Sequence, residues 1–533
     1  MEKQNFQMVA KTFQGLEDVL RDELISLGAE NVETGRRMVS FEGDLETMYR
    51  ANLCCRTALR ILKPIEKFSA SDPDELYDIV RDIEWEKYMT PETTFAIDST
   101  VNSDEFPHSR YVTYRVKDAI VDHFRDRYGK RPSIRVSGAD LMLNVHIFDD
   151  RITISLDSSG EPLSKRGYRV EQTVAPINEV LAAGIIMKTG WHGECDFADP
   201  MCGSGTFLIE AALIAANINP GIYRSSFAFE KWPDFDKELF EEIYNDDSAE
   251  KEFAFKILGG DIDPEAVAIA RKNIKEAKVE DMIDLSCRPL SEWTDNPETG
   301  VLVMNPPYGE RIRPEDMTAL YKGIGTALKQ NFKGWQAWII GLNDEDFANI
   351  GLKPTVKIPL FNGNLECSLR EFILFDGRYS DFMADGGDLG KFGDEDQQER
   401  RPRKMKHISD DEWRKETRKF GHNRDKDREG RRFDKGPRKF DKSDRKFDKG
   451  ERKFERGDRK FDRDDRKFER GDRKFDRDDR KFERGDRKFD KAPRRFEKKP
   501  YTPADKGPSI PESEATVFSR YPMRSRRPKN REE

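Results

Sequence analysis

The sequence is short of the residues that build metal sites and disulfide frameworks. Its 533 residues include only six cysteines and six histidines. No two cysteines show the C-x-x-C spacing that is typical of zinc sites, and the histidines do not cluster. We therefore expect reduced thiols, no disulfide framework and no metal.

Long hydrophobic runs are also absent. The longest, such as Val180 to Met187, fall well short of the roughly 18 apolar residues that a membrane-spanning helix needs. The start of the chain, Met1 to Gln4, does not lead into the apolar core of a signal peptide. The sequence thus predicts a soluble, cytoplasmic protein that has no membrane partner.

The balance of charge changes along the chain. Residues 1–390 carry 44 Lys and Arg against 68 Asp and Glu, a net charge of −24. Residues 391–533 carry 51 against 35, a net charge of +16. The overall charge of −8 therefore describes an acidic body followed by a basic segment, and the basic segment is the better candidate for contact with a polyanion.

The C-terminal segment, residues 381–533, is a low-complexity repeat. In units such as Asp444-Arg445-Lys446-Phe447, phenylalanines recur every seven residues, at positions 433, 440, 447, 454, 461, 468, 475, 482, 489 and 496. A coiled coil needs two apolar positions per heptad and this repeat has one, so we expect a disordered, basic tail. Arg and Phe can stack on unpaired bases, which favours salt-sensitive RNA binding, and a purely solubilising tail is the alternative.

Residues 1–157 are predicted to form two small α+β modules, 1–62 and 63–157. In the first, we expect strands from Phe6 to Thr12 and from Val32 to Phe41. In the second, we expect a long amphipathic helix from Tyr111 to Tyr128 and a hairpin that turns at Asp149-Asp150. The long helix is rich in Arg and Lys, which indicates either a solvated face or a surface that faces RNA.

A linker over residues 158–173 is expected to act as a hinge before the largest domain, residues 174–380. In that domain, short apolar runs alternate with helical patterns. This rhythm predicts an α/β fold with a mainly parallel sheet that helices cover on both faces. Asn362-Gly363 is a strong hairpin signal, so the last strand is expected to be antiparallel.

A glycine-rich segment, Asp199 to Thr206, follows the first predicted strand of this domain and opens an apolar helix. Gly203 and Gly205 permit a tight turn with a ligand close to the backbone, and a helix N-terminus favours a carboxylate or phosphate. A nicotinamide-binding fingerprint would need a small residue where Leu208 stands and an acidic residue about 20 positions later. Both are missing, which argues against a nicotinamide enzyme.

Two further strand ends carry polar residues. Asp261 ends the second strand, where a carboxylate is placed to bind the ribose hydroxyls of a nucleoside cofactor. Asp263 is either part of that site or a helix cap. The run Val301 to Met304 predicts a buried strand that stops at Asn305-Pro306-Pro307-Tyr308. This segment offers an amide, carbonyl groups of prolines, which have no N–H, and an aromatic ring. Such a set is suited to binding a flat nitrogen base.

These three motifs, in this order, resemble the class I S-adenosylmethionine-dependent methyltransferases that modify exocyclic amines. Residues 1–380 as a whole resemble the THUMP-containing RlmL family of large-subunit rRNA guanine-N2 methyltransferases. The additional matching segments are Ser159 to Arg169, Ala175 to Glu179, Pro220-Gly221 and Phe227 to Trp232. The resemblance implies a ferredoxin-like module over 1–62, a THUMP RNA-binding domain over 63–157 and a Rossmann-like domain with a seven-stranded sheet over 174–380.

The resemblance also implies S-adenosylmethionine as the cofactor and roles for single residues. Asp199 would hold the amino end of the cofactor, Gly203 and Gly205 would lie against its methionine part, and Asp261 would hold its ribose. Asn305 and the Pro306 carbonyl would hold the guanine amino group, with Tyr308 stacked on the ring. The implied cofactor set is Asp199, Pro200, Cys202, Gly203, Gly205, Thr206, Asp261 and Asp263, and the implied catalytic set is Asn305, Pro306, Pro307 and Tyr308.

The chain departs from the family pattern in two places. Cys287-Arg288-Pro289 stands where relatives often have an acidic residue near the adenine, so no adenine contact is predicted. The charged repeat stands where some relatives carry a second methyltransferase domain, so a second activity is not expected. Two other functions stay open: a tRNA guanine-N2 methyltransferase, and a non-catalytic RNA-binding factor for ribosome assembly.

Overall fold

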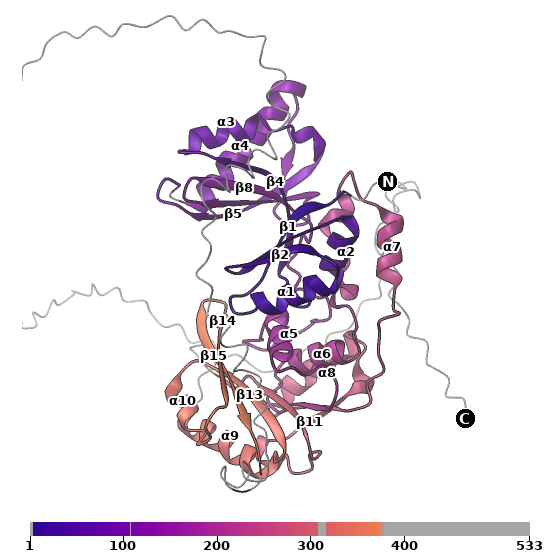
Figure 1. Cartoon of the computed structure of the whole chain (residues 1–533), viewed down its shortest axis with the longest axis vertical. Coiled ribbons are helices and arrows are strands. Elements are labelled where there is room, and N and C mark those ends of the chain that lie inside the picture. Colours follow the sequence, from indigo (N-terminus) through magenta and orange to yellow (C-terminus); the bar gives the residue numbers. More distant parts are fainter. Residues whose placement is uncertain (1–3, 107, 308–315, 376, 378–533) are drawn as a thin grey trace, which may run out of the picture. The chain divides into compact units, whose positions relative to one another are not determined.

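Two β-sheets organise the chain in the computed structural model, which describes residues 4–106, 108–307, 316–375 and 377 (Figure 1). We call them sheet A, with eight strands from residues 6–157, and sheet B, with seven strands from residues 196–373. Within these described ranges, no helix has the length and apolar character needed to cross a bilayer.

Sheet A joins the two N-terminal modules through one shared strand. Its strands are β1 (Phe6–Lys11), β2 (Glu30–Gly35), β3 (Met38–Gly43), β4 (Arg60–Ser69), β5 (Thr94–Asn102), β6 (Ser133–Ile134), β7 (Leu141–Phe148) and β8 (Arg151–Asp157). They lie in the order β2-β3-β1-β4-β8-β7-β5-β6. Strand β4 pairs with β1 at residues 60–62 and with β8 at residues 62–69, both antiparallel. The expected boundary between residues 62 and 63 thus falls inside a strand that both modules use.

Four helices share one hydrophobic core with sheet A. They are α1 (Glu17–Ser26), α2 (Leu45–Cys54), α3 (Pro73–Arg81) and α4 (Ser109–Tyr128). Each helix buries an apolar stripe, and Leu24, Met48, Val80 and Val116, one from each helix, are all 1% exposed or less. These residues belong to a single hydrophobic cluster, which also contains every second residue of β7 and therefore one face of that strand. All four helices therefore pack on the same face of the sheet.

Local signals explain several of these elements, and one prediction was wrong. The predicted hairpin at Asp149 is confirmed: β7 and β8 pair antiparallel, and Asp149 takes a φ of +54° in the turn. The segment from Val32 to Phe41, however, is not a single strand. It divides into β2 and β3, which pair antiparallel around a turn in which Arg37 has a φ of +59°.

Sheet B has the predicted mainly parallel topology. Its strands are β9 (Asp196–Asp199), β10 (Ile257–Asp261), β11 (Ile283–Cys287), β12 (Gly300–Met304), β13 (Trp335–Gly341), β14 (Val356–Asn362) and β15 (Leu365–Ile373). The order is β11-β10-β9-β12-β13-β15-β14. The first five strands run parallel, and β15 is antiparallel to both β13 and β14, as the Asn362-Gly363 turn predicted.

Helices cover both faces of sheet B, which confirms the α/β class. One layer holds α5 (Glu179–Lys188), α6 (Thr206–Ala215) and α8 (Pro264–Glu276), and the other holds α9 (Met317–Asn331) and α10 (Asp344–Ala348). Strand β12 shows why the central strands are continuously apolar. Val301 and Val303 pack into the first layer, while Leu302 and Met304 pack into the second.

Much of the connection between the two sheets is packed against both domains up to Tyr168, which argues against the expected hinge at residues 158–173. Ser158, Ser159, Leu163, Arg166 and Tyr168 are all 2% exposed or less. A segment that packs this closely has little freedom to bend without exposing apolar and polar groups that are now satisfied.

Residues 219–246 of the sheet B domain reach back to helix α2. They form η2 (Pro220–Tyr223), η3 (Ala228–Lys231) and α7 (Lys237–Asn245). The rings of Tyr49 and Phe229 stack at 4.6 Å, and the Tyr49 hydroxyl accepts a hydrogen bond from Asp236 N at 3.0 Å. A Cβ at Gly221 would lie 2.7 Å from the carbonyl oxygen of Leu53, so only glycine permits this approach.

Candidate active site

Three polar strand ends meet at one edge of sheet B. Strands β10, β9 and β12 are neighbours and run parallel, so their carboxyl ends lie side by side. Asp261 ends β10, Asp199 ends β9 and Asn305 follows β12. The fold thus brings together three motifs that are spread over residues 199–305, at the edge where open α/β sheets bind ligands.

The glycine-rich segment forms the tight turn that its composition predicted. Gly203 and Gly205 have φ values of +51° and +80°, a region that favours glycine. Cys202 N donates to Gly260 O at 2.9 Å, which fixes the turn to β10. Helix α6 begins at Thr206 without a side-chain cap, so its first N–H groups are left for a ligand or solvent.

The Asp261 carboxylate connects the turn to the end of β10. Its Oδ2 accepts a hydrogen bond from Gly203 N and its Oδ1 accepts one from Asp263 N, both at 3.0 Å. The side chain of Asp263 accepts from Glu265 N at 2.9 Å and caps α8. Of the two interpretations left open for Asp263, the structure shows the helix cap, and its cofactor role stays a prediction.

Asp199 is a buried carboxylate that receives few hydrogen bonds from the described residues. It is 1% exposed, and the described residues give it one hydrogen bond, from Met201 N at 3.1 Å. Burial, with a smaller contribution from the Asp261 charge, raises the pKa of Asp199 well above its ordinary value. A bound cation would stabilise the ionised form, so this site fits the ammonium group of an amino acid moiety.

Cys202 does not fit a reactive thiol. It is 6% exposed, and burial raises the pKa of its thiol well above the ordinary value, with the charge of Asp199 acting in the same direction. The protonated thiol is a poor nucleophile. Cys202 therefore packs in the turn as a neutral thiol, and its role in cofactor binding stays a prediction.

Asn305 presents an unused acceptor at the end of β12. Its Oδ1 is shielded from solvent, and no described residue donates a hydrogen bond to it. Pro306 is buried beside it, and as a proline it has a carbonyl but no N–H. An unsatisfied buried acceptor costs roughly 1–3 kcal/mol, which a ligand N–H would offset. Tyr308 lies outside the described residues, so its stacking role stays a prediction.

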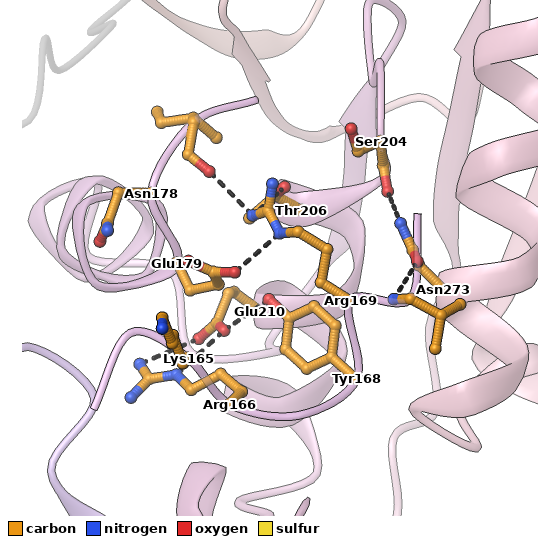
Figure 2. Close-up of polar contacts among 12 residues, drawn as sticks. Lys165, Arg166, Tyr168, Arg169, Asn178, Glu179, Ser204, Thr206, Glu210 and Asn273 are labelled. Carbon is orange, nitrogen blue, oxygen red and sulfur yellow. Dashed lines mark hydrogen bonds and ion pairs between the residues drawn. The ribbon is translucent and has the colours of Figure 1, made fainter. Parts of the chain in front are cut away.

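A polar network behind the turn contains residues that sequence reasoning missed (Figure 2). Arg166 Nε lies 3.3 Å from Glu210 Oε1, and the Tyr168 hydroxyl donates to the same oxygen at 2.8 Å. Arg169 bridges Glu179 at 2.7 Å and the Thr206 hydroxyl at 3.0 Å. The matching segment Ser159 to Arg169 pointed to this region, but no local pattern identified Glu210 as its partner.

The basic residues on and just after α4 are largely paired with carboxylates, so they offer less net positive charge than the sequence indicated. Such exposed pairs are weak and can be exchanged, so the solvated face and the RNA-facing surface both stay open. The pairs are Arg115–Asp74, Lys117–Asp118, Arg125–Asp122, Arg127–Glu86 and Lys130–Glu92, with distances of 2.5 to 3.4 Å.

An open groove of about 720 Å³ runs beside β10 and β11, from residues near the starts of the strands to Arg288, which follows β11. Its lining includes Asp196, which starts β9, Lys256, which precedes β10, and Pro297, which precedes β12. None of the residues predicted to bind cofactor or substrate lines this groove. The candidate site is therefore the polar edge of the sheet and not this depression.

These features define a class I methyltransferase domain, whose cofactor is S-adenosylmethionine. They are the sheet order, the glycine turn after β9, the acidic end of β10 and the Asn-Pro-Pro sequence after β12. Comparison with known families supports this class. A model described as an RMKL-like methyltransferase domain matches residues 166–371, a THUMP domain matches residues 70–157, and the RlmL ferredoxin-like domain matches residues 7–62.

Individual relatives agree. A Syntrophotalea carbinolica protein named ribosomal RNA large subunit methyltransferase K/L is 40% identical over 385 residues, which are 70% of this chain and 54% of that protein. A Synechocystis sp. protein, provisionally named as an RNA methyltransferase, is 36% identical over 369 residues, which are 69% of this chain and 96% of that protein. The chain therefore belongs to the RlmL-like family of THUMP-containing methyltransferases.

The solved structures show the same fold with a cofactor product. A provisionally named methyltransferase in complex with S-adenosylhomocysteine has a TM-score of 0.63 and 32% identity, covering 71% of this chain and 100% of the other. The chain spans about half the length of the curated K/L relatives that it matches, with 54% of one and 50% of another.

Proposed function

We propose that this protein transfers a methyl group from S-adenosylmethionine to the exocyclic N2 of a guanosine in large-subunit rRNA. The observation that carries the proposal is the buried Asn305 Oδ1, to which none of the described residues donates and which lies at the same sheet edge as the Gly203 turn and Asp261. The 40% identity to a protein named as an rRNA large subunit methyltransferase supports the choice of RNA, and the THUMP match supports RNA binding.

The chemistry needs the chain to activate a weak nucleophile. The lone pair of an aromatic amine is delocalised into its ring, so the nitrogen attacks poorly while the group stays planar. Two acceptors, Asn305 Oδ1 and the Pro306 carbonyl, are suited to bind the two N–H groups and favour a pyramidal nitrogen. The target base must leave its stack to reach such a site.

The bound cofactor supplies an electrophilic methyl group on a sulfonium. As the N–CH3 bond forms, the S–CH3 bond breaks, and the nitrogen becomes positively charged and very acidic. Its proton can then pass to water, so no strong base is needed. Asp199 and Asp261 hold the amino and ribose ends of the cofactor, which fixes the position of the methyl group relative to Asn305.

The modified nucleotide tests this function directly. In a strain that lacks the gene, mass spectrometry of separated rRNA and tRNA should show the loss of one N2-methylguanosine from large-subunit rRNA. Loss from tRNA instead would select the tRNA alternative. Loss from neither, together with no binding of S-adenosylmethionine by the purified protein in calorimetry, would select the non-catalytic assembly factor.

Cofactor binding should release a proton from Asp199. Because the pKa of Asp199 is raised, the free protein holds this proton to higher pH than an ordinary carboxyl group does. The ionised form attracts the ammonium of the cofactor, so binding should release the proton and weaken as pH falls. Calorimetry of S-adenosylhomocysteine binding in buffers of different ionisation enthalpy measures this release.

Two substitutions test the assignment to Asp199. Asp199→Asn should abolish proton release and weaken binding by about 10-fold or more, equivalent to one pKa unit of coupling. Asp263→Asn, which alters the helix cap, should release the proton as the wild type does. Undiminished release in Asp199→Asn would show that another group titrates.

The tail, which lies outside the described residues, is proposed to add non-specific affinity for RNA. Deletion after Asp381 removes residues 391–533, which carry a net charge of +16, and leaves the acidic body. RNA affinity should fall and its salt dependence should flatten, while methyl transfer at saturating RNA continues. Unchanged affinity and salt slope in a filter-binding titration would favour the solubilising role instead.

A further inference from the structure

A buried asparagine behind the glycine turn uses all of its hydrogen-bonding capacity on the main chain, and Figure 2 shows its bond to Ser204. Asn273, in α8, is 1% exposed. Its Oδ1 accepts from the N–H groups of Val170 at 3.0 Å and Glu171 at 3.2 Å. Its Nδ2 donates to the carbonyl oxygens of Glu171 at 2.9 Å and Ser204 at 3.0 Å. An asparagine amide offers two donors and two lone pairs, so none is left over.

Ser204 is the point at which this asparagine reaches the cofactor turn. It lies between Gly203 and Gly205, which both have positive φ, and peptide groups flanked by glycine rotate at low cost. Gly203 N is held by Asp261 Oδ2, and Ser204 O is held by Asn273 Nδ2. Side chains from two elements thus fix both ends of the Gly203–Ser204 segment.

The linker is fixed to the same turn. Thr173 N donates to Ser204 Oγ at 3.0 Å, and the Thr173 hydroxyl lies 3.0 Å from the same atom. A Cβ at Gly203 would meet only Thr173 Oγ1, at 3.7 Å, so the space above Gly203 is bounded by the linker. Asn273 therefore holds the turn and the segment that borders it in one arrangement.

We propose that Asn273 is a positioning residue for the methyl-donor site, which holds the Gly203–Gly205 turn in the conformation that receives the cofactor. The inference rests on the proposed cofactor site. A turn that is already ordered loses less conformational entropy on binding, so the effect is on cofactor affinity. The chemical step at saturating cofactor depends on Asn305 and is not affected.

The test compares two equally buried asparagines. In Asn273→Asp, the side chain loses one donor when protonated and both when ionised. Asn52→Asp is the matched control, since Asn52 is also 1% exposed and bonds Met48 O, Ser158 Oγ and Ser159 Oγ, away from the cofactor turn. Both variants should lose thermal stability. Only Asn273→Asp should bind S-adenosylhomocysteine about 10–100-fold more weakly, as expected for a lost buried hydrogen bond.

Kinetics and pH separate positioning from a general loss of stability. In Asn273→Asp, the KM for S-adenosylmethionine should rise with the dissociation constant, while kcat and the KM for RNA stay within about 3-fold of the wild type. Relative to the wild type at the same pH, its affinity should worsen as pH rises, because ionisation removes the last donor. If the variant does not fold, Asn273→Ser, which is too short to reach Ser204 O, should show the same loss of affinity.

Two failures are distinguishable. If the wild type does not bind S-adenosylhomocysteine, the proposed function fails. If the wild type binds and the folded Asn273 variant binds equally well, or if Asn52→Asp loses the same affinity, Asn273 has no positioning role.

Discussion

Asn305→Ala should lower the rate of methyl transfer by about 100–1,000-fold, because it removes a hydrogen-bond acceptor that acts on the nucleophile in the transition state. The affinities for S-adenosylhomocysteine and for RNA should stay within a few-fold, since Asn305 touches neither the Gly203 turn nor the N-terminal modules in the proposed arrangement. Single-turnover transfer of a labelled methyl group to rRNA measures the chemical step.

The chain offers a matched control for this substitution. Asn296 also has a buried Oδ1 that no described residue donates to, but it precedes β12, whereas Asn305 follows that strand. Asn296→Ala should leave the single-turnover rate close to that of the wild type. Near-normal transfer by Asn305→Ala would refute the catalytic role of Asn305, and an equal loss in both variants would indicate a general effect on folding.

Glu210→Ala should destabilise the protein by about 3–5 kcal/mol, the cost expected when one partner of a buried ion pair is removed. Glu210 is fully buried, and its loss would leave the Arg166 guanidinium and the Tyr168 hydroxyl without their acceptor. Arg166 also donates to the Arg56 carbonyl at 2.5 Å. The substitution should therefore also weaken the contact between the linker and the N-terminal module. The shift in the denaturation midpoint in urea, at constant slope, measures the change.

An exposed ion pair in the same segment serves as the control. Lys165 and Glu161 lie 2.5 Å apart with side chains 69% and 55% exposed. Glu161→Ala should change the unfolding free energy by less than about 1 kcal/mol, since water and salt screen such pairs. A small effect of Glu210→Ala, similar to that of Glu161→Ala, would show that the linker is not held by this pair.

Local and topological rules explain how much of the site the sequence could predict. Asp199, Asp261 and Asn305 each end an apolar run, and parallel strands place their carboxyl ends at one edge, so the juxtaposition follows from the α/β rhythm. The Gly203 turn and the Asn362-Gly363 hairpin also follow, because glycine is favoured where φ is positive. These predictions need only the chain order of the elements.

The failures share a different cause. The linker 158–173 contains Ser, Gly, Pro, Lys and Arg and was expected to bend, but Arg166 is buried against Glu210, which lies 44 residues further along the chain. The split of residues 32–41 into two strands depended on a two-residue turn at Arg36-Arg37, and neither of these residues is a glycine or an asparagine, although Gly35 precedes them. Burial of a polar residue is decided by a distant partner and leaves no local pattern.

The sequence by itself determined the class of domain and the three motifs that meet in its site, because apolar periodicity and turn residues act over a few neighbouring positions. The tertiary structure alone decided that Asn273 bonds the cofactor turn and that Glu210 pairs with Arg166 of the linker. Those assignments depend on hydrogen bonds and ion pairs between residues far apart in the chain, which form only when folding excludes water from between them.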